Sequence, residues 1–237
     1  MLTVVIKRSD DPRVIQLTQK EMSKQLWSIN GAEVLLEDSW NLGLRKVRTP
    51  YVCLVEADCT LSANYFMANY GIMRDTHAIH GGGNTKVAML SSCLGVRDFG
   101  NRIYNFELDV VKVPVIGNRT SEGERVQVRE WHVRPVRNKL ELKTYPVQIG
   151  FVPGSIIRMT SIRDLIDDSV WEYKDLVRMS TAVSFYFWDT NRRLLLNSNT
   201  TYVSADKKME NPPLFDVKVP DKVAHIFQQE LIGQIPV

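Results

Sequence analysis

Two carboxylates stand two residues apart in Glu56-Ala57-Asp58, directly after the apolar run of residues 51–55. On an extended segment, two carboxylates at this spacing can bracket one divalent cation. Mn²⁺ and Mg²⁺ prefer such hard oxygen ligands, and Mg²⁺ commonly uses one or two carboxylates together with substrate phosphates. The pair therefore predicts a metal site at Glu56 and Asp58, where the cation would neutralise a departing diphosphate.

Acidic residues also follow the two preceding apolar runs. Asp10 follows the run of residues 2–6, and Asp38 follows the run of residues 32–36. In an open parallel sheet, ligands bind where the carboxyl ends of the strands meet the loops. If these runs are neighbouring strands, the acids gather at one edge and form a ligand site. The alternative is that they are ordinary solvated loop acids.

The elements that would position these acids alternate regularly along the first hundred residues. Strands are expected at 2–6, 32–36, 51–55 and 86–96, with helices at 12–27, 41–47 and 62–73 between them. Ser62 is expected to cap the last of these helices. This alternation predicts βαβ units and a mostly parallel sheet. Short extended runs within 103–150 indicate an antiparallel portion. A strand at 155–159, a helix at 172–187, a strand at 194–203 and an irregular tail from 207 complete the expected α/β fold.

Composition bounds the class of protein. The 237 residues are 44% hydrophobic and 24% charged, which suits one large α/β domain over 1–237, or one domain with a small appendage, and argues against a disordered chain. The net charge of +3 permits a phosphate-bearing partner without requiring one. The three cysteines match no zinc spacing and are typical of reduced thiols. No apolar segment is long enough to span a bilayer and no signal peptide is evident, so a cytoplasmic location is expected.

Residues 38–45, followed by 49–59, resemble glycosyltransferase family 2. In that family an asparagine-x-glycine turn, here Asn41-Leu42-Gly43, opens a helix, and an apolar strand then delivers a DxD-like acid pair. The resemblance covers about residues 2–75, and residues 153–158 look like the acceptor-side glycine segment of the family. It implies a GT-A-like fold, with a nucleotide-sugar-binding half at 1–100, an acceptor-side half at 101–206 and a C-terminal tail at 207–237.

The resemblance also implies roles for single residues. Asp10 or Asp38 would contact the nucleoside of a donor such as UDP-glucose, and Arg45 and Lys46 would lie near its diphosphate, beside the turn of Asn41 and Gly43. Glu56 and Asp58 would hold Mn²⁺ or Mg²⁺. The transfer would be inverting, with a general base at the start of the last long helix, where Asp175 is the best match and Glu172 and Asp168 are rivals.

The chain departs from the family pattern at four places. Its first loop, residues 7–10, lacks the prolines that are usual in the family. Lys174 precedes Asp175 where the family has an acid pair, and the first acid of the triplet is Glu56 rather than aspartate. The family's late histidine has no clear match near residues 204–206. The metal is therefore expected to bind weakly without substrate, or Asp206 contributes to its site.

Residues 118–143 carry seven basic and four acidic side chains, so their excess of +3 equals the net charge of the whole chain. Trp131 lies among Arg129, Arg134 and Arg137. Basic residues interleaved with an aromatic ring can bind a phosphate backbone and stack on a base. The segment supports a hydroxylated nucleic-acid base as the sugar acceptor, and its alternative is an antiparallel hairpin with a solvated charged face.

Two other functions remain open. A sugar-nucleotide nucleotidyltransferase uses a related sheet and a basic first loop; Lys7 and Arg8 supply the charge, although the usual glycines are missing. A non-catalytic module that binds nucleotide sugars would also fit the altered base motif.

Overall fold

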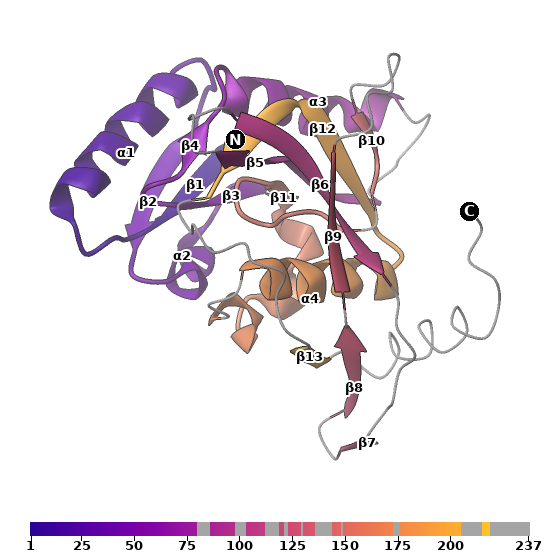
Figure 1. Ribbon diagram of the computed structural model, residues 1–237. Helices are drawn as coiled ribbons and strands as arrows, with labels where there is room; N and C mark the ends of the chain where they lie inside the picture. The colour runs from indigo at the N-terminus through magenta and orange to yellow at the C-terminus, as the bar shows by residue number, and fades with distance from the viewer. Residues whose placement is uncertain are drawn as a thin grey trace.

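The computed structural model describes residues 1–79, 86–97, 103–111, 119–120, 123–128, 130–135, 144–147, 149–172, 176–204 and 215–218. Its first part contains β1 (Leu2–Lys7), α1 (Pro12–Leu26), β2 (Glu33–Glu37), α2 (Trp40–Lys46), β3 (Tyr51–Glu56), β4 (Thr60–Leu61), α3 (Tyr65–Ile79) and β5 (Val87–Arg97). The second part contains β6 (Ile103–Val111), β7 (Arg119–Thr120), β8 (Gly123–Val128), β9 (Glu130–Pro135), β10 (Thr144–Pro146), β11 (Ile156–Arg158), the 3-10 turns η1 (Met159–Ser161), η2 (Arg163–Leu165) and η3 (Ser169–Glu172), α4 (Leu176–Asp189), β12 (Arg193–Val203) and β13 (Phe215–Lys218). Figure 1 shows their arrangement.

The main sheet has the strand order β10-β12-β5-β11-β3-β1-β2. The strands β2, β1, β3, β5 and β12 all run in one direction, because β11 is antiparallel to both β3 and β5 and therefore leaves those two parallel to each other. β6 pairs antiparallel with β5, and β9 pairs antiparallel with β6. The expected α/β class, with a mostly parallel core and an antiparallel second part, is confirmed.

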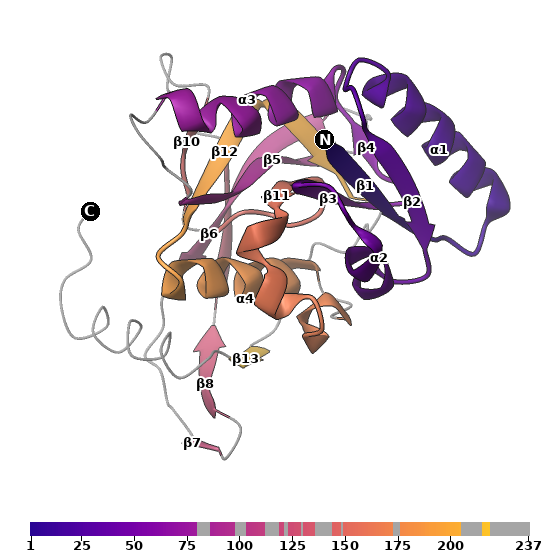
Figure 2. The same ribbon diagram turned by 180° about the vertical axis from the view of Figure 1, so that it is seen from behind.

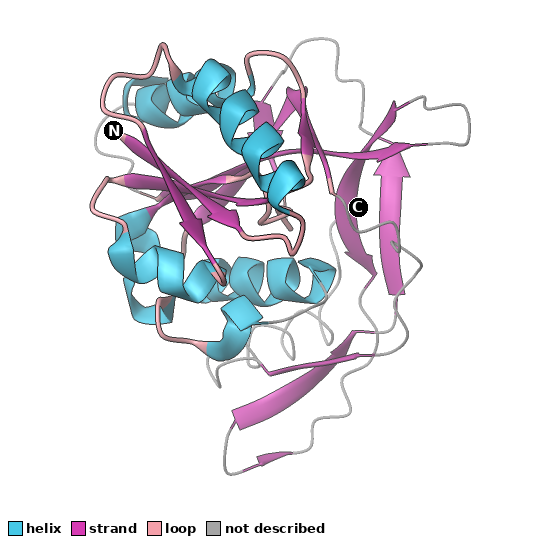
Figure 3. Cartoon of the chain, turned by 90° about the vertical axis from the view of Figure 1, so that its left-hand side faces the viewer, coloured by secondary structure: helices cyan, strands magenta, loops and turns pink. Residues whose placement is uncertain are grey.

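Helices cover both faces of this sheet, α1 and α3 on one and α2 and α4 on the other (Figures 2 and 3). The strand sequences explain the two layers, since successive side chains point to opposite faces. In β3, Cys53 and Val55 pack in the cluster that includes Met22 of α1 and Phe66 of α3. Val52 and Leu54 pack with α2 and α4 instead. A strand that is buried on both faces needs an unbroken apolar sequence, as residues 51–55 have.

Local capping sets the helix starts near the expected sites. Asp11 is the N-cap of α1 and its carboxylate accepts a hydrogen bond from the Arg13 backbone N–H at 2.8 Å, with Pro12 in the first turn. Ser62 was expected to cap α3, and this expectation is wrong. Its hydroxyl accepts from the Thr201 backbone N–H at 3.0 Å, which ties it to β12, and α3 begins three residues later at Tyr65.

The last long helix starts later than its sequence pattern predicts. Residues 169–172 form the separate turn η3, where Trp171 is buried, and α4 begins at Leu176. Trp171 of η3 and Met179 of α4 pack in the same hydrophobic cluster, so the apolar spacing of the sequence predicts one helix across both elements. In the part of the chain that the structure describes, no helix has both the length and the apolar character needed to cross a membrane.

Candidate functional site

The site is built at the carboxyl edge of β1, β2 and β3, where three strand ends stand in register. Lys7 pairs with Glu37 of β2 on one side and with Glu56 of β3 on the other. The loops that carry the remaining predicted acids leave from this edge. The sheet therefore does place the ends of the three predicted strands together, as the parallel arrangement requires.

Glu56 is held in place by hydroxyl groups from a distant strand. The Tyr202 hydroxyl donates to Glu56 Oε2 at 3.0 Å, and the Ser204 hydroxyl donates to the same oxygen at 2.6 Å. The Glu56 backbone N–H in turn donates to the Tyr202 hydroxyl at 3.2 Å. Both partners come from the end of β12, so the half-buried carboxylate is oriented by a strand far away in the sequence.

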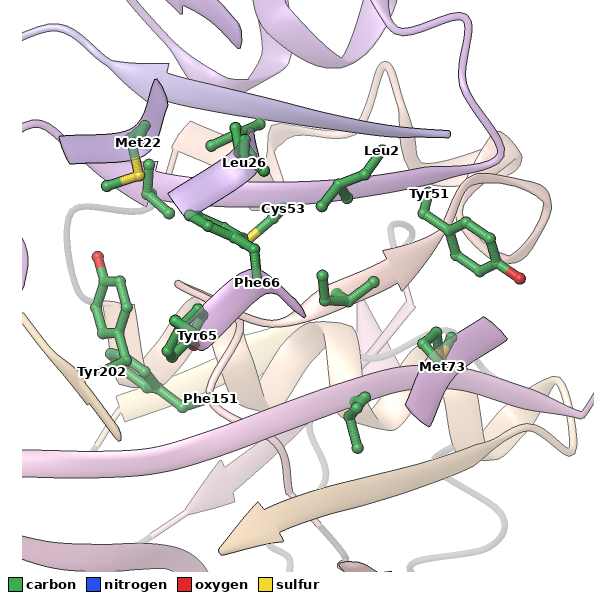
Figure 4. Packing of buried hydrophobic residues seen from close by; sticks show 14 of the residues in the cluster. Leu2, Met22, Leu26, Tyr51, Cys53, Tyr65, Phe66, Met73, Phe151 and Tyr202 are labelled. Atoms are coloured by element: carbon green, nitrogen blue, oxygen red, sulfur yellow. The ribbon is translucent and has the colours of Figure 1, made fainter. Parts of the chain in front are cut away.

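Tyr202 itself sits in a tightly packed pocket of aromatic rings. Its side chain is completely buried, with its ring centroid 6.0 Å from that of Phe151, and Tyr65 lies nearby (Figure 4). The Tyr65 hydroxyl donates to the Gly154 carbonyl at 2.8 Å. Burial, followed by the neighbouring Cys59 and Glu56, raises the pKa of Tyr202 well above its usual value. The phenol therefore keeps its proton at neutral pH and remains a hydrogen-bond donor to Glu56.

The second acid of the pair, Asp58, is exposed, while Ala57 between the two is buried. Cys59 follows, and burial raises the pKa of its thiol to about 12, with Glu56 and Asp58 adding to the shift. The donor atoms that the predicted pair Glu56 and Asp58 offers are carboxylate oxygens, which are hard ligands. This donor set suits Mg²⁺ or Mn²⁺.

Among the described residues, no three His, Cys, Asp or Glu side chains come close enough together to hold a metal ion. Two carboxylates are enough for a cation that also binds phosphate oxygens of a substrate. The chemistry of Glu56 and Asp58 fits a metal that arrives with its substrate, and this metal site stays a prediction. Asp206, the alternative contributor, lies outside the described residues.

The acids expected to contact a nucleoside are both at the surface. Asp38 forms an ion pair with Arg8 at 3.1 Å, across the ends of β2 and β1. Asp10 is exposed in the loop before α1. Lys7 Nζ lies 5.5 Å from the centre of the Trp40 ring. The edge of the site therefore carries two cations at the end of β1, and the contact of Asp10 or Asp38 with a nucleoside stays a prediction.

Arg45 and Lys46 lie in the last turn of α2, and each faces a carboxylate. Arg45 Nε is 2.8 Å from Asp167 Oδ1, and Lys46 Nζ is 2.8 Å from Glu37 Oε1. Both cations are more than half exposed, so these ion pairs exchange readily with water or with another anion. Their expected role near a diphosphate stays a prediction.

Gly43 has a packing role in the structure. A Cβ atom at this position would overlap Val5 Cγ1, so α2 approaches β1 more closely than any other residue would allow. Asn41, two residues earlier, is also buried, with 8% of its surface exposed. The asparagine-x-glycine pattern thus brings α2 onto the sheet, and its contact with a cofactor stays a prediction.

We expect Gly43→Ala to destabilise the protein by about 1–3 kcal/mol, because the gain in helix propensity is smaller than the cost of overpacking. The double variant Gly43→Ala/Val5→Ala should regain part of this loss, since the removed methyl groups make room for the new Cβ. Urea unfolding of the two single variants and the double variant gives the coupling free energy. Additive effects at the two positions would contradict a direct contact.

The candidates for a general base lie beyond the 3-10 turns. Asp168 Oδ1 accepts from the Val170 backbone N–H at 2.8 Å, which caps η3, and Glu172 is exposed at the end of that turn. Asp175 lies outside the described residues. α4 returns to the start of β12 through a short turn, in which Arg192 N donates to Phe187 O at 2.7 Å. Because α4 therefore runs opposite to β12, its first turn lies toward the edge of the sheet that carries Glu56.

Of the residues in the basic segment, Trp131 and Arg134 belong to β9, opposite Val110 and Glu107 of β6. Arg129 and Arg137 lie outside the described residues. The antiparallel pairing expected for this segment is present, and its binding to nucleic acid stays a prediction.

Sequence reasoning missed Tyr202 and Ser204. The run of residues 194–203 predicts a strand, and nothing in or beside it marks Tyr202 and Ser204 as partners of an acid 146 and 148 positions earlier. The signal that could have been used is the pair of hydroxyl residues at the end of a strand in a parallel sheet, where ligand sites form.

No protein family model matches the sequence, and a search of curated proteins finds no match. Among solved structures, the chain is similar to GalNAc-T7 with UDP, GalNAc and Mn²⁺, at 12% identity and a TM-score of 0.49, over 86% of this chain and 43% of that one. It is also similar to S. aureus TarS, at 8% identity and a TM-score of 0.45, over 86% of this chain and 36% of TarS. A structure of TarS 1–349 in complex with UDP-GlcNAc matches at 11% identity and a TM-score of 0.44, over 88% and 59% of the two chains. This chain therefore spans between about a third and three fifths of the length of these proteins.

Proposed function

We propose that the chain is a glycosyltransferase that binds a nucleoside-diphosphate sugar and a divalent cation, Mn²⁺ or Mg²⁺, at the carboxyl edge of β1, β2 and β3. The observation that carries this proposal is the oriented carboxylate of Glu56, with its Oε2 atom bound by two hydroxyl groups and the exposed carboxylate of Asp58 beside it. The carboxylate of Glu56 is fixed at the end of β3, and that of Asp58 is exposed to water. Such a pair suits a cation that also binds a diphosphate.

A bound cation would neutralise the negative charge that develops on the departing diphosphate. Lys7 and Arg8, at the end of β1, add positive charge at the same edge. The proposed sugar acceptor is a hydroxylated nucleic-acid base, because the segment 118–143 carries an excess of positive charge that can bind a phosphate backbone.

In the proposed inverting reaction, the acceptor oxygen attacks the anomeric carbon of the sugar while the bond from that carbon to the diphosphate oxygen breaks. The acceptor proton passes to a carboxylate, for which Asp175 and Glu172 are the candidates, and the nucleoside diphosphate leaves with the bonding electron pair. The direction of α4 supports this placement, since its first turn lies toward the edge that carries Glu56.

Thermal unfolding with a panel of nucleotide sugars tests the donor site. A ligand at about one hundred times its Kd adds about 2.7 kcal/mol to the free energy of unfolding, which corresponds to a rise in Tm of roughly 5–10 °C for a domain of this size. We expect such a rise with UDP-glucose or another member of the panel, larger with Mn²⁺ than with a chelator. No shift with any donor would overturn the proposal, and a shift only with nucleoside triphosphates would favour a nucleotidyltransferase.

The products of the transfer reaction identify the sugar acceptor. Mass spectrometry after incubation with the stabilising donor and with hydroxylated DNA, oligosaccharide or small-molecule acceptors should show the added mass of one sugar. Hydrolysis of the donor without transfer to any of these would leave a nucleotide-sugar-binding module as the better description.

A further inference from the structure

The strand that orients Glu56 is irregular, and the irregularity comes immediately before the two hydroxyl residues. In the pairing of β12 with β5, Asn197 stands opposite Ser92 and Thr201 stands opposite Cys93. Successive residues of β5 are therefore matched by residues four apart on β12. Three residues, 198–200, lie between these two register pairs and form a bulge in β12.

The bulge changes which face of the sheet the following side chains reach. Leu195 and Tyr202 pack in the same cluster, on the side of α1 and α3. They are seven positions apart, and an uninterrupted strand would send residues separated by an odd number to opposite faces. Leu194, by contrast, packs on the side of α2 and α4. Tyr202 reaches its pocket, and through it Glu56, because the bulge inverts the alternation of the strand.

A buried polar network holds this bulge. Asn69 of α3 accepts hydrogen bonds at Oδ1 from Asn197 Nδ2 at 2.9 Å and from the Thr200 hydroxyl at 3.1 Å. Its Nδ2 atom donates to Ser92 Oγ at 3.0 Å, and Ser92 Oγ lies 2.8 Å from Thr200 Oγ1. The four side chains are at most 4% exposed. Asn69 thus bonds to both ends of the bulge and to the strand beside it.

This network gives each polar side-chain atom of Asn69, Ser92 and Thr200 a hydrogen-bond partner when its protons are assigned in one direction. Asn69 donates to Ser92, Ser92 donates to Thr200, and Thr200 donates back to Asn69, whose second lone pair accepts from Asn197. A closed set of buried hydrogen bonds favours one geometry strongly, because each broken bond would leave a polar group without a partner.

We propose that Asn69 and Thr200 are positioning residues for Glu56: they lock the bulge of β12 in the one form that aims the Tyr202 and Ser204 hydroxyls at the carboxylate. This inference rests on the proposed function in that Glu56 serves there as a metal ligand. Partners that orient a ligating group typically change metal affinity by about 10–100-fold when they are lost.

Thr200 offers a matched pair of variants for the test. Thr200→Val keeps the shape of the side chain and removes the hydroxyl, and Thr200→Ser keeps the hydroxyl. Asn69→Leu removes the centre of the network, and if it does not fold, the Thr200 pair carries the test. Thr76→Val is the control on the same helix, because the buried Thr76 hydroxyl donates to the backbone carbonyl of Met73 and takes no part in the network around Asn69.

Two measurements decide the outcome. The first is the Kd for Mn²⁺ in the presence of UDP, from the electron paramagnetic resonance signal of free Mn²⁺. We expect Thr200→Val to raise this Kd about tenfold, with Thr200→Ser and Thr76→Val close to the unsubstituted protein. The second is the distance from Tyr202 Oη to Glu56 Oε2 in a crystal structure of Thr200→Val, which should exceed hydrogen-bonding range.

An unchanged Kd together with an intact contact between Tyr202 and Glu56 would overturn the inference. So would an equal loss of Mn²⁺ affinity in Thr76→Val, because the effect would then follow from lower stability alone. If the unsubstituted protein bound no Mn²⁺ with UDP, the proposed function would fail, and the crystallographic distance would still decide whether the network positions Glu56.

Discussion

Replacing Asp58 with alanine is expected to abolish sugar transfer while leaving the fold intact. Asp58 is exposed, and within the described part of the chain its side chain forms no hydrogen bond or ion pair. Its loss should therefore change the free energy of unfolding by no more than about 0.5 kcal/mol. A cation that neutralises a leaving diphosphate is worth several kcal/mol in the transition state, so turnover should fall by about a thousandfold or more.

The measurement is the rate of transfer at saturating donor, together with Mn²⁺-dependent thermal stabilisation by UDP. Asp58→Asn should behave like Asp58→Ala, since an amide keeps the shape and loses the charge. Asp75→Asn is the control, because Asp75 is an exposed acid on α3 that pairs with its neighbour Arg74. Full activity of Asp58→Ala in an enzyme with Mn²⁺-dependent turnover would place the metal elsewhere.

Replacing Gly154 with alanine should lower the free energy of unfolding more than Gly43→Ala or Gly71→Ala does. Gly154 has a φ of +78°, and a Cβ there would overlap Tyr202 Cδ2 and lie 2.5 Å from the Tyr65 hydroxyl oxygen. The backbone conformation costs alanine about 1–2 kcal/mol, and forcing two buried rings apart costs about 1–3 kcal/mol more. We expect a loss of about 3 kcal/mol and a fall in Tm of roughly 10 °C.

Gly154→Ala should also disturb the candidate metal site, because it displaces the ring of Tyr202, whose hydroxyl donates to Glu56. Gly154→Ala should therefore weaken Mn²⁺ binding in the presence of UDP even at temperatures where it is folded. Gly71→Ala is a strict comparison: a Cβ at this mid-helix position of α3 meets nothing within 4 Å, and the substitution should be neutral or stabilising by up to about 1 kcal/mol. Equal melting temperatures for the two variants would refute the crowding at Gly154.

Much of the fold could be predicted because its signals are local. The apolar run 51–55 is long enough to identify a strand that is buried on both faces, and Pro12 after Asp11 identifies a helix start. The spacing of these elements determines a parallel arrangement, and that arrangement alone places the tip of β3, with Glu56, at a ligand-binding edge.

What could not be predicted depends on contacts between distant segments. Ser62 was a reasonable cap by its type, and it bonds to β12 instead because the strand supplies a backbone N–H that no local rule describes. The partners of Glu56 depend on the bulge at 198–200, which reverses the faces of β12. A bulge is stabilised by side chains from other elements, here Asn69, so the sequence of the strand itself does not reveal it.

The position of β11 has a consequence for how the chain folds during synthesis. β11 is inserted between β3 and β5, and its residues come from far downstream of both strands. Until Arg158 has left the ribosome, β3 and β5 each expose an open edge, and sheets that close late over long loops form slowly. The nascent chain therefore carries two separate sheet fragments for much of its synthesis, a period in which premature pairing with another chain competes with completion of the domain.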